Sequence, residues 1–218
     1  MNKLLVNGND YISDGIYNII NDNNIGNVTL HINGNVTLNL NNIKLDYIKL
    51  VLNNNAILKL YKYNDNCNDL KVDIYCKDNN YLEYNESIQN KKDTKLEINN
   101  YIEGNNSNSL INIRIVSYEG TSTIIVNTIV KKDTFENIAT ENLKGITNGG
   151  KVRIDPNIEC FTNEVSANHL TTIGNINVDS LNYLMSKGIS EKVAKETLLK
   201  GFIFSNMNEF IKKENGGE

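Results

Sequence analysis

The sequence predicts a mainly β protein that ends in a small α-helical segment. From about residue 26 to residue 169, apolar residues fall at every second position in short runs, which is the pattern of half-buried strands. Clusters of Asn, Asp, Gly or Lys separate these runs at intervals of about ten residues, as turns do. Near Gly174 the apolar period changes from two to about 3.6, the helical period. We therefore expect a β core over residues 1–174 and a helical segment over residues 175–218.

The β core consists of short runs that resemble one another. The clearest read NVTLHI, NVTLNL, DYIKLVL, AILKLY, DLKVDIY, TKLEIN, SLINIRIVS and STIIVNTIV. Pro156 is the only proline, so nearly every residue in the core can donate its backbone N–H to a neighbouring strand. Many short strands at even spacing are typical of a sandwich, a barrel or a β-helix. The alternation alone does not choose among these three.

The helical segment begins with a helix that Asn177 or Asp179 can cap and that ends near Gly188. Its apolar residues are Val178, Leu181, Leu184 and Met185. Ser190 is a good N-cap for a second helix, and Glu191 favours its positive end. We expect this helix to pack on the β core, on a partner or on both through one face, formed by Val193, Ala194, Thr197, Leu198, Gly201 and Phe202. Met207, Phe210 and Ile211 indicate a third, shorter helix, so the helices should lie within residues 178–213.

Composition excludes several classes of function. The net charge is −4, and Arg114 and Arg153 are the only arginines, so the basic surface of a nucleic-acid-binding protein is missing. The sequence has no apolar run of about 18 residues and no secretion signal, so we expect a cytoplasmic protein without a membrane segment. It also has no phosphate-binding G-x-x-x-x-G-K-[ST] loop and no Ser-His-Asp arrangement, so we expect neither ATP hydrolysis nor triad chemistry in this chain.

Three cysteines, Cys67, Cys76 and Cys160, form no C-x-x-C pair, which argues against a disulfide framework and against a self-contained zinc site. Cys67 and Cys76 flank a strand and could converge on neighbouring rungs, but we interpret both as structural. His31 should be a core or rung residue without a functional role. The abundance of Asn is mainly a compositional bias, with a smaller contribution from Asn side chains that stabilise turns.

The segment from Asn142 to Ile203 resembles the C-terminal part of SufB and SufD, the scaffold proteins of the SUF iron-sulfur cluster assembly system. In that family a strand with a proline, an apolar residue and an acid leads to a strand with a His, followed by small residues and two helices. The matching positions are Pro156, Ile158, Glu159, His169, Thr172, Gly174, Asp179, Leu181, Tyr183, Leu184, Lys187, Gly188, Ile189, Ala194, Leu198, Gly201 and Phe202. Upstream, the resemblance extends only as compatible strand patterning.

The resemblance implies a right-handed parallel β-helix whose C-terminal helices bind a SufC-like ABC ATPase. It also implies that two scaffold chains associate through their β-helices. This chain lacks the long N-terminal helical region of the larger members and is more similar to short versions in which one scaffold serves both roles. We therefore expect a homodimer with two ATPase subunits, and the alternative is a complex with a SufB/SufD-like paralogue.

Two residues near the end of the β core are candidates for holding a nascent iron-sulfur cluster. His169 matches the family's His, for which the resemblance implies cluster ligation. The alternative is a buried, neutral His bonded to backbone. Cys160 lies on the preceding strand with Ile158 on its own face. Its thiolate could bind iron or accept sulfur from a sulfur donor, and the alternative is an inert buried thiol.

Leu170 stands where SufB-like sequences have an acid. Either Glu159 or Glu164 supplies the carboxylate, or the chain is a SufD-like adaptor that recruits the ATPase without holding the cluster. The leading interpretation is a non-enzymatic cluster scaffold. A β-helical carbohydrate-active enzyme is a third possibility, which the absence of Trp and of a secretion signal disfavours.

Overall fold

The computed structural model describes residues 2–6, 8–20 and 26–216, which form strands first and helices last. The strands are β1 (Asn2–Leu5), β2 (Asn9–Ile12), β3 (Gly15–Ile20), β4 (Asn27–Ile32), β5 (Asn35–Asn41), β6 (Tyr47–Leu52), β7 (Ile57–Asp65), β8 (Leu70–Cys76), β9 (Tyr81–Asn90), β10 (Thr94–Ile102), β11 (Asn108–Ser117), β12 (Thr121–Val130), β13 (Asn137–Thr147), β14 (Lys151–Cys160) and β15 (Val165–Gly174). The helices are α1 (Val178–Ser186), α2 (Glu191–Phe204) and α3 (Glu209–Glu214).

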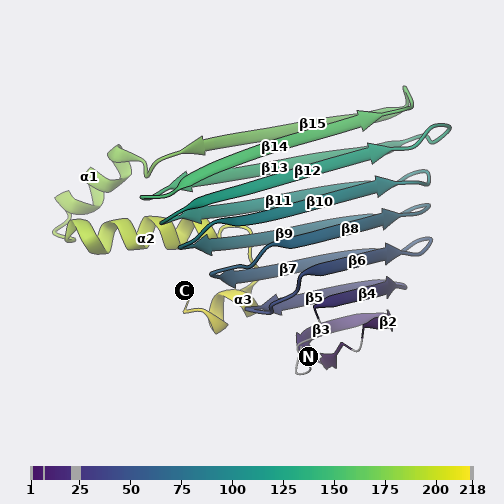
Figure 1. Ribbon diagram of the computed structural model, residues 1–218, viewed down its shortest axis with the longest axis horizontal. Helices are drawn as coiled ribbons and strands as arrows, with labels where there is room; N and C mark the ends of the chain where they lie inside the picture. The colour runs from purple at the N-terminus through teal and green to yellow at the C-terminus, as the bar shows by residue number, and fades with distance from the viewer. Residues whose placement is uncertain (1, 7, 21–25, 217–218) are drawn as a thin grey trace.

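The strands form a two-sided parallel β-solenoid (Figure 1). Odd-numbered strands make an 8-stranded sheet in the order β1-β3-β5-β7-β9-β11-β13-β15, and even-numbered strands make a 7-stranded sheet in the order β14-β12-β10-β8-β6-β4-β2. Each turn of the chain adds one strand to each sheet, and each new strand pairs in parallel with the strand two places earlier. The prediction of a mainly β chain with a parallel β-helix is confirmed, and an antiparallel sandwich or barrel is excluded. Strands also precede residue 26, where the sequence pattern was weakest.

The core fills the space between the two sheets, which we call the lumen. Along β12 every second residue is buried, and the in-register neighbours of a buried residue are buried too. Val72, Ile98 and Val126 stack in this way on successive turns and are completely buried. Each such side chain contributes about 1.5–3 kcal/mol through its removal from water. The lumen is therefore a continuous apolar column that each turn extends.

Asparagines shape the turns between strands. Asn55, Asn79 and Asn106 adopt left-handed backbone conformations with φ of 63°, 55° and 53°, which Asn tolerates better than most residues. The three also stack, because the Asn79 Nδ2 donates to Asn55 Oδ1 at 3.1 Å and the Asn106 Nδ2 donates to Asn79 Oδ1 at 3.2 Å. Asparagine at these turns therefore has a structural use.

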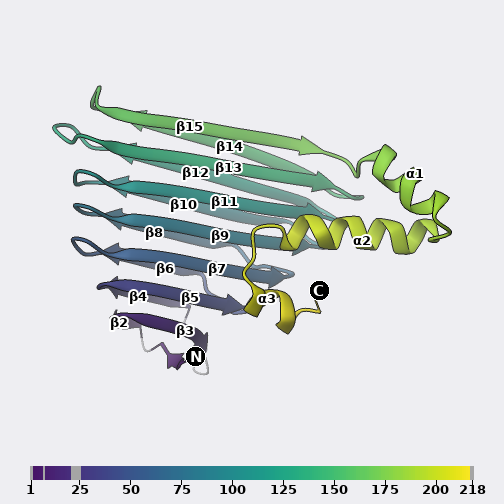
Figure 2. The ribbon, with the colours of Figure 1, turned by 180° about the vertical axis from the view of Figure 1, so that it is seen from behind.

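Helices α2 and α3 lie on the outer face of the 8-stranded sheet (Figure 2), where α2 contacts β9 and β11 and α3 contacts β5 and β7, whereas α1 contacts α2. Hydrogen bonds fix this arrangement. The Ser87 hydroxyl on β9 donates to the Ile203 carbonyl at 2.7 Å, and the Arg114 Nε on β11 donates to the Ser205 hydroxyl at 3.3 Å. The buried apolar residues of this layer are Tyr63, Val116, Leu199, Ile203, Phe204, Met207 and Ile211.

The predicted helix starts are correct, and the predicted apolar face of α2 is only partly buried in the single chain. Asn177 and Ser190 are the N-caps of α1 and α2. In α2 the buried residues are Ala194, Leu199, Ile203 and Phe204, whereas Val193, Thr197 and Gly201 are exposed. The buried residues and the exposed residues both recur at helical spacing along α2. The sheet contacts the set that includes Leu199, Ile203 and Phe204, which have the larger side chains.

The end of β15 at Gly174 coincides with the predicted boundary between the β core and the helical segment. Whether the two parts are separate domains stays a prediction. Among the described residues, no helix is both long enough and apolar enough to span a bilayer.

Candidate functional site

The last turn of the solenoid, which we call the terminal turn, consists of β14, residues 161–164 and β15. Its two strands are edges, because β14 ends the 7-stranded sheet and β15 ends the 8-stranded sheet. Every residue of β15 except Val165 is exposed, although the alternation of the preceding strands continues into it. The inner side of the terminal turn is therefore an open end of the lumen.

β15 differs from the other edge strands. β1 and β2 are four residues long and carry Lys3 and Asp10, and β14 carries Pro156 and several charges. Such features prevent an edge from pairing with another chain. β15 has ten residues, with no Lys, Arg, Asp, Glu or Pro. It is therefore the one long, unprotected edge in the part of the chain that the structure describes.

Register defines which side chains face the lumen. His169 pairs with Glu141, a buried lumen residue of β13, and Cys160 pairs with Val130, a buried lumen residue of β12. Paired residues of parallel strands point to the same side of the sheet. His169 and Cys160 therefore both lie on the lumen side of the terminal turn. Glu159 alternates with Cys160 and lies on the outer side.

Within one chain the structure does not bring His169 and Cys160 together. Cys160 ends β14 beside the turn that contains Glu164, while His169 lies four residues into β15, about 13 Å along the strand. No group of three or more His, Cys, Asp or Glu side chains suited to a metal ion occurs among the described residues. A single chain therefore offers two partial sets, His169 in mid-strand and Cys160 with its neighbouring acids at the turn.

The alternatives of a buried, neutral His169 and an inert, buried Cys160 are wrong, because both residues are exposed in the chain. Partial desolvation raises the pKa of the Cys160 thiol, so the thiol form predominates at neutral pH. A metal ion would have to displace this proton, as metals do when they bind thiols.

Glu141, the register neighbour of His169, is not among the site residues predicted from the sequence. Glu141 is 1% exposed. Its Oε1 accepts a hydrogen bond from the Thr128 hydroxyl at 2.7 Å, and its Oε2 has no hydrogen-bond partner among the described residues. Burial raises the pKa of Glu141 to about 7, and the bond from Thr128 opposes this shift. An unsatisfied buried polar group costs about 1–3 kcal/mol. The strand alternation marks Glu141 as a lumen residue, so a charged residue at a core position was the available signal.

A polar path continues from Glu141 through the lumen. Below Thr128 in the same sheet lies Asn100, whose Nδ2 donates to Thr128 Oγ1 at 3.5 Å and to Ser109 Oγ at 2.9 Å. The Cys76 thiol lies 3.9 Å from the Asn100 Oδ1. The lumen is therefore polar along one line beneath the terminal turn.

Cys67 and Cys76 are buried, as their structural interpretation requires, but Cys67 precedes β8 and Cys76 ends it, so the two thiols do not converge. Burial raises the pKa of Cys76 to about 12, so this thiol is inert near neutral pH. His31 lies on the outer face of the 7-stranded sheet, where its ring stacks on Tyr11 with centroids 4.5 Å apart. It is a rung residue rather than a core residue.

A second polar cluster lies deeper in the lumen. The buried Lys62 ammonium contacts Glu86 Oε1, and the Tyr84 hydroxyl donates to Glu86 Oε2 at 2.5 Å. Burial alone would lower the pKa of Lys62, but the Glu86 carboxylate outweighs this effect and raises it. Here the buried carboxylate has a cation and a hydroxyl as partners, whereas Glu141 has a hydroxyl alone.

The helices form an exposed apolar groove next to the terminal turn. A cavity of about 430 Å³ between α1 and α2 is lined by Tyr183, Leu184 and Leu198, among others. In α1 no residue is buried, and Val178 and Tyr183 are 64% and 62% exposed. A helix pair with this much exposed apolar surface is typical of a protein-docking site.

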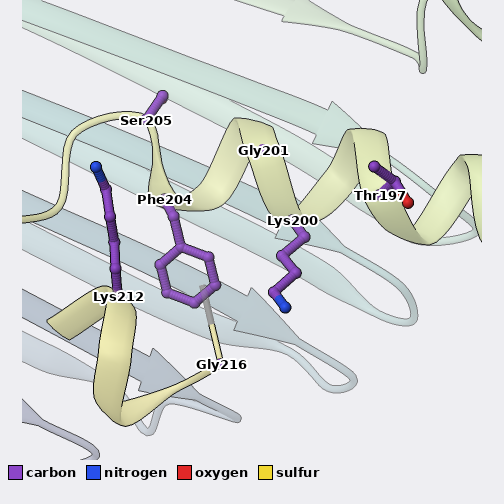
Figure 3. Close-up of a pocket in the computed structure, with 7 residues that line it drawn as sticks. All are labelled: Thr197, Lys200, Gly201, Phe204, Ser205, Lys212 and Gly216. Carbon is purple, nitrogen blue, oxygen red and sulfur yellow. The ribbon is translucent and has the colours of Figure 1, made fainter. Parts of the chain in front are cut away.

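Another cavity, next to the last two helices, contains none of the candidate residues. It measures about 650 Å³ and lies between α2 and α3, where Lys200 and Lys212 flank Phe204 (Figure 3). Lys212 pairs with Glu209 at 3.1 Å. Lys212 lies in the last turn of α3, where the helix dipole favours a lysine.

Comparison with known proteins identifies the family of the chain. A family model described as "SUF system FeS cluster assembly, SufBD core domain" matches residues 89–202, more than half of the chain. An iron-sulfur cluster assembly SufBD family protein of Mycobacterium leprae is 41% identical over 71 residues, which are 32% of this chain and 17% of that protein. One of Pyrococcus horikoshii is 26% identical over 130 residues, 58% of this chain and 29% of that protein.

The matches cover less than a third of the length of either relative. The family match includes the whole terminal turn, α1 and most of α2. It therefore covers the open end of the lumen, Glu141 and the exposed groove. The chain belongs to the SufBD core family of the SUF iron-sulfur cluster assembly system.

Proposed function

We propose that this chain is a scaffold subunit that holds a nascent iron-sulfur cluster at its terminal turn while a SufC-like ABC ATPase docks on α1 and α2. The observation that carries the proposal is the open terminal turn, which presents His169 and Cys160 on the lumen side of an unprotected edge. Family membership supplies the chemical context, because members of this family are components of iron-sulfur cluster assembly. The cluster is cargo, and the chain itself performs no catalysis.

A second copy of the chain completes the site. An uncharged edge strand can pair in antiparallel fashion with its own copy across a two-fold axis. His169 lies near the middle of β15, so this pairing would bring the histidines of the two chains close to the axis. Each chain contributes too few ligands for a cubane cluster, which takes about four, and a two-fold axis doubles the set. A SufB/SufD-like paralogue with a similar edge would serve the same purpose.

The ligand types suit a cluster that must be released. Cys160 supplies a thiol, His169 an imidazole, and Glu159 or Glu164 a carboxylate. Fewer than four thiolates hold iron less firmly, which favours transfer to a recipient. Glu164 lies in the turn beside Cys160, whereas Glu159 lies on the outer side of β14, so Glu164 is the better placed of the two acids. Cys160 is also the exposed thiol that could accept sulfur from a donor protein.

The ATPase site rests on the groove between α1 and α2. α2 is bound to β9 and β11, so a partner that moves this helix would also move the sheet that ends in β15. ATP-driven association of two ATPase subunits could in this way change the interface of two scaffold chains, a rigid-body coupling. Deletion of the residues after Gly174 should abolish co-purification with the ATPase, and normal binding by a folded truncated chain would place the docking site elsewhere.

The alternative function is a SufD-like adaptor that recruits the ATPase without holding the cluster. The distance between His169 and Cys160 along the strand is the observation that favours it. In the adaptor, the terminal turn would pair with a paralogue that supplies the ligands.

Anaerobic reconstitution with iron and sulfide separates the two functions. The scaffold should take up both and develop visible absorption, and Cys160→Ser and His169→Ala should each reduce iron and sulfide per dimer. Asn168→Ala is the matched control, because it lies beside His169 on the outer side of β15. Unchanged iron and sulfide in both variants, with unchanged circular dichroism and ATPase binding, would favour the adaptor.

A further inference from the structure

One carboxylate oxygen of Glu141 has no hydrogen-bond partner among the described residues. Thr128 satisfies Oε1, and Oε2 is buried without a hydrogen bond among the described residues. Protonation of the carboxylate does not supply the missing partner. A proton on Oε2 would be a donor without an acceptor, and a proton on Oε1 would leave Oε2 as an acceptor without a donor. A partner must come from outside the described chain.

Among the residues that the structure describes, no positively charged side chain lies in the lumen around Glu141. Its neighbours on the lumen side of β13 are Ala139 and Leu143, and its register neighbour in β11 is Ile111. The buried lysine of the chain, Lys62, is paired with Glu86 three turns away. A cation that enters from the open end would therefore meet a carboxylate without a competing positive side chain.

His169 lies directly above Glu141 in register, on a strand about 4.8 Å away. Both residues face the lumen side, so an imidazole nitrogen and a carboxylate oxygen can approach the same point. Imidazole and carboxylate are the ligand pair of many non-haem ferrous sites, whereas clusters prefer thiolates. The pair therefore suits a single divalent ion better than a preformed cluster.

We propose that Glu141 and His169 of one chain form a binding site for a ferrous ion, which the terminal turn can occupy before sulfide arrives. This inference rests on the proposed function, since it names the form in which iron first binds at the same turn. Water completes the coordination, because no third His, Cys, Asp or Glu of the described chain joins the pair. Such an ion is held loosely and remains open to sulfide.

The test is an anaerobic titration of the full chain with Fe²⁺ alone, without sulfide, read by equilibrium dialysis and by the shift in melting temperature. The wild-type chain should bind one ion per chain. Glu141→Gln keeps the size of the side chain and an acceptor for Thr128, and should weaken binding by at least about tenfold, as should His169→Ala. Asp155→Asn is the matched control, because Asp155 belongs to the terminal turn but lies on its outer side, and it should bind like the wild type.

The outcomes separate this inference from the proposed function. If the wild type binds no Fe²⁺ alone, or if Glu141→Gln binds it as the wild type does, the ferrous site is wrong. If the chain nevertheless reconstitutes with iron and sulfide, the scaffold function stands. If Fe²⁺ binds in a Glu141-dependent manner but no cluster forms with sulfide, the ferrous site stands and the scaffold function fails.

Discussion

The middle turns of the solenoid and its terminal turn have similar sequence patterns but opposite surroundings. β12 alternates buried and half-buried residues along its whole length, whereas β15 is exposed from Ser166 to Gly174. The buried polar groups differ in the same way, because Glu86 has Lys62 and Tyr84 as partners while Glu141 has Thr128 alone. The middle turns are complete within one chain. The terminal turn has the sequence pattern of the middle turns, but no further turn covers it. This indicates that another chain or a ligand covers it.

The largest effect should come from the complete polar cluster in the middle turns. Glu86→Gln leaves the Lys62 ammonium buried without a counter-charge, which should lower the free energy of unfolding by about 3–5 kcal/mol. Urea denaturation at neutral pH measures this loss. A loss below about 1 kcal/mol would mean that Lys62 becomes neutral or hydrated without cost, and that the two polar clusters are less different than their contacts indicate.

The apolar residues of the two regions should differ almost as much. Ile124→Ala in β12 removes a completely buried side chain and should cost about 2–5 kcal/mol. Ile173→Ala on the lumen side of β15 removes a side chain that is 45% exposed, so the loss in a monomer should stay below about 1 kcal/mol. The same urea experiments compare the two variants, with each chain diluted until it is monomeric. Equal losses would show that the terminal turn is covered in the monomer.

Glu141 should make stability depend on pH. Its folded pKa is about 7 and its ordinary value is 4.5, so the folded chain holds a proton that the unfolded chain loses first. Stability should therefore fall as the pH rises from about 4.5 through about 7. Glu141→Gln should remove this loss and stabilise the metal-free chain at pH 8 by at most about 3 kcal/mol. Thermal unfolding of both chains between pH 5 and pH 8 tests this, and a variant less stable than the wild type at about pH 8 would contradict it.

The sequence predicted what depends on local periodicity and capping. The alternation in NVTLHI and STIIVNTIV identified strands, and Asn177 and Ser190 identified helix starts. What depends on neighbours distant in sequence was not predictable from the pattern. Parallel pairing is set by which strands stack, and the packing face of α2 is set by the sheet beneath it, so Val193 and Leu199 were equally good candidates.

The candidate site divides in the same way. His169 and Cys160 were identified through the resemblance, and register then placed both on the lumen side. Glu141 was missed because only the pairing of β13 with β15 places its carboxylate beneath His169. The sequence shows that both residues can bind a metal ion, but it does not show that Glu141 and His169, 28 positions apart, are neighbours.

The association of two chains through β15 is the most direct test of the account. Leu170→Lys places a charge at the middle of this edge, where the two-fold arrangement would bring two lysines together. Leu5→Lys is the matched control on β1, the opposite edge of the same sheet. Sedimentation equilibrium of the purified chain should show a dimer for the wild type and for Leu5→Lys, and a folded monomer for Leu170→Lys. A wild-type monomer at all concentrations, or a Leu170→Lys dimer as stable as the wild type, would contradict the claim that the terminal turn is where two scaffold chains meet.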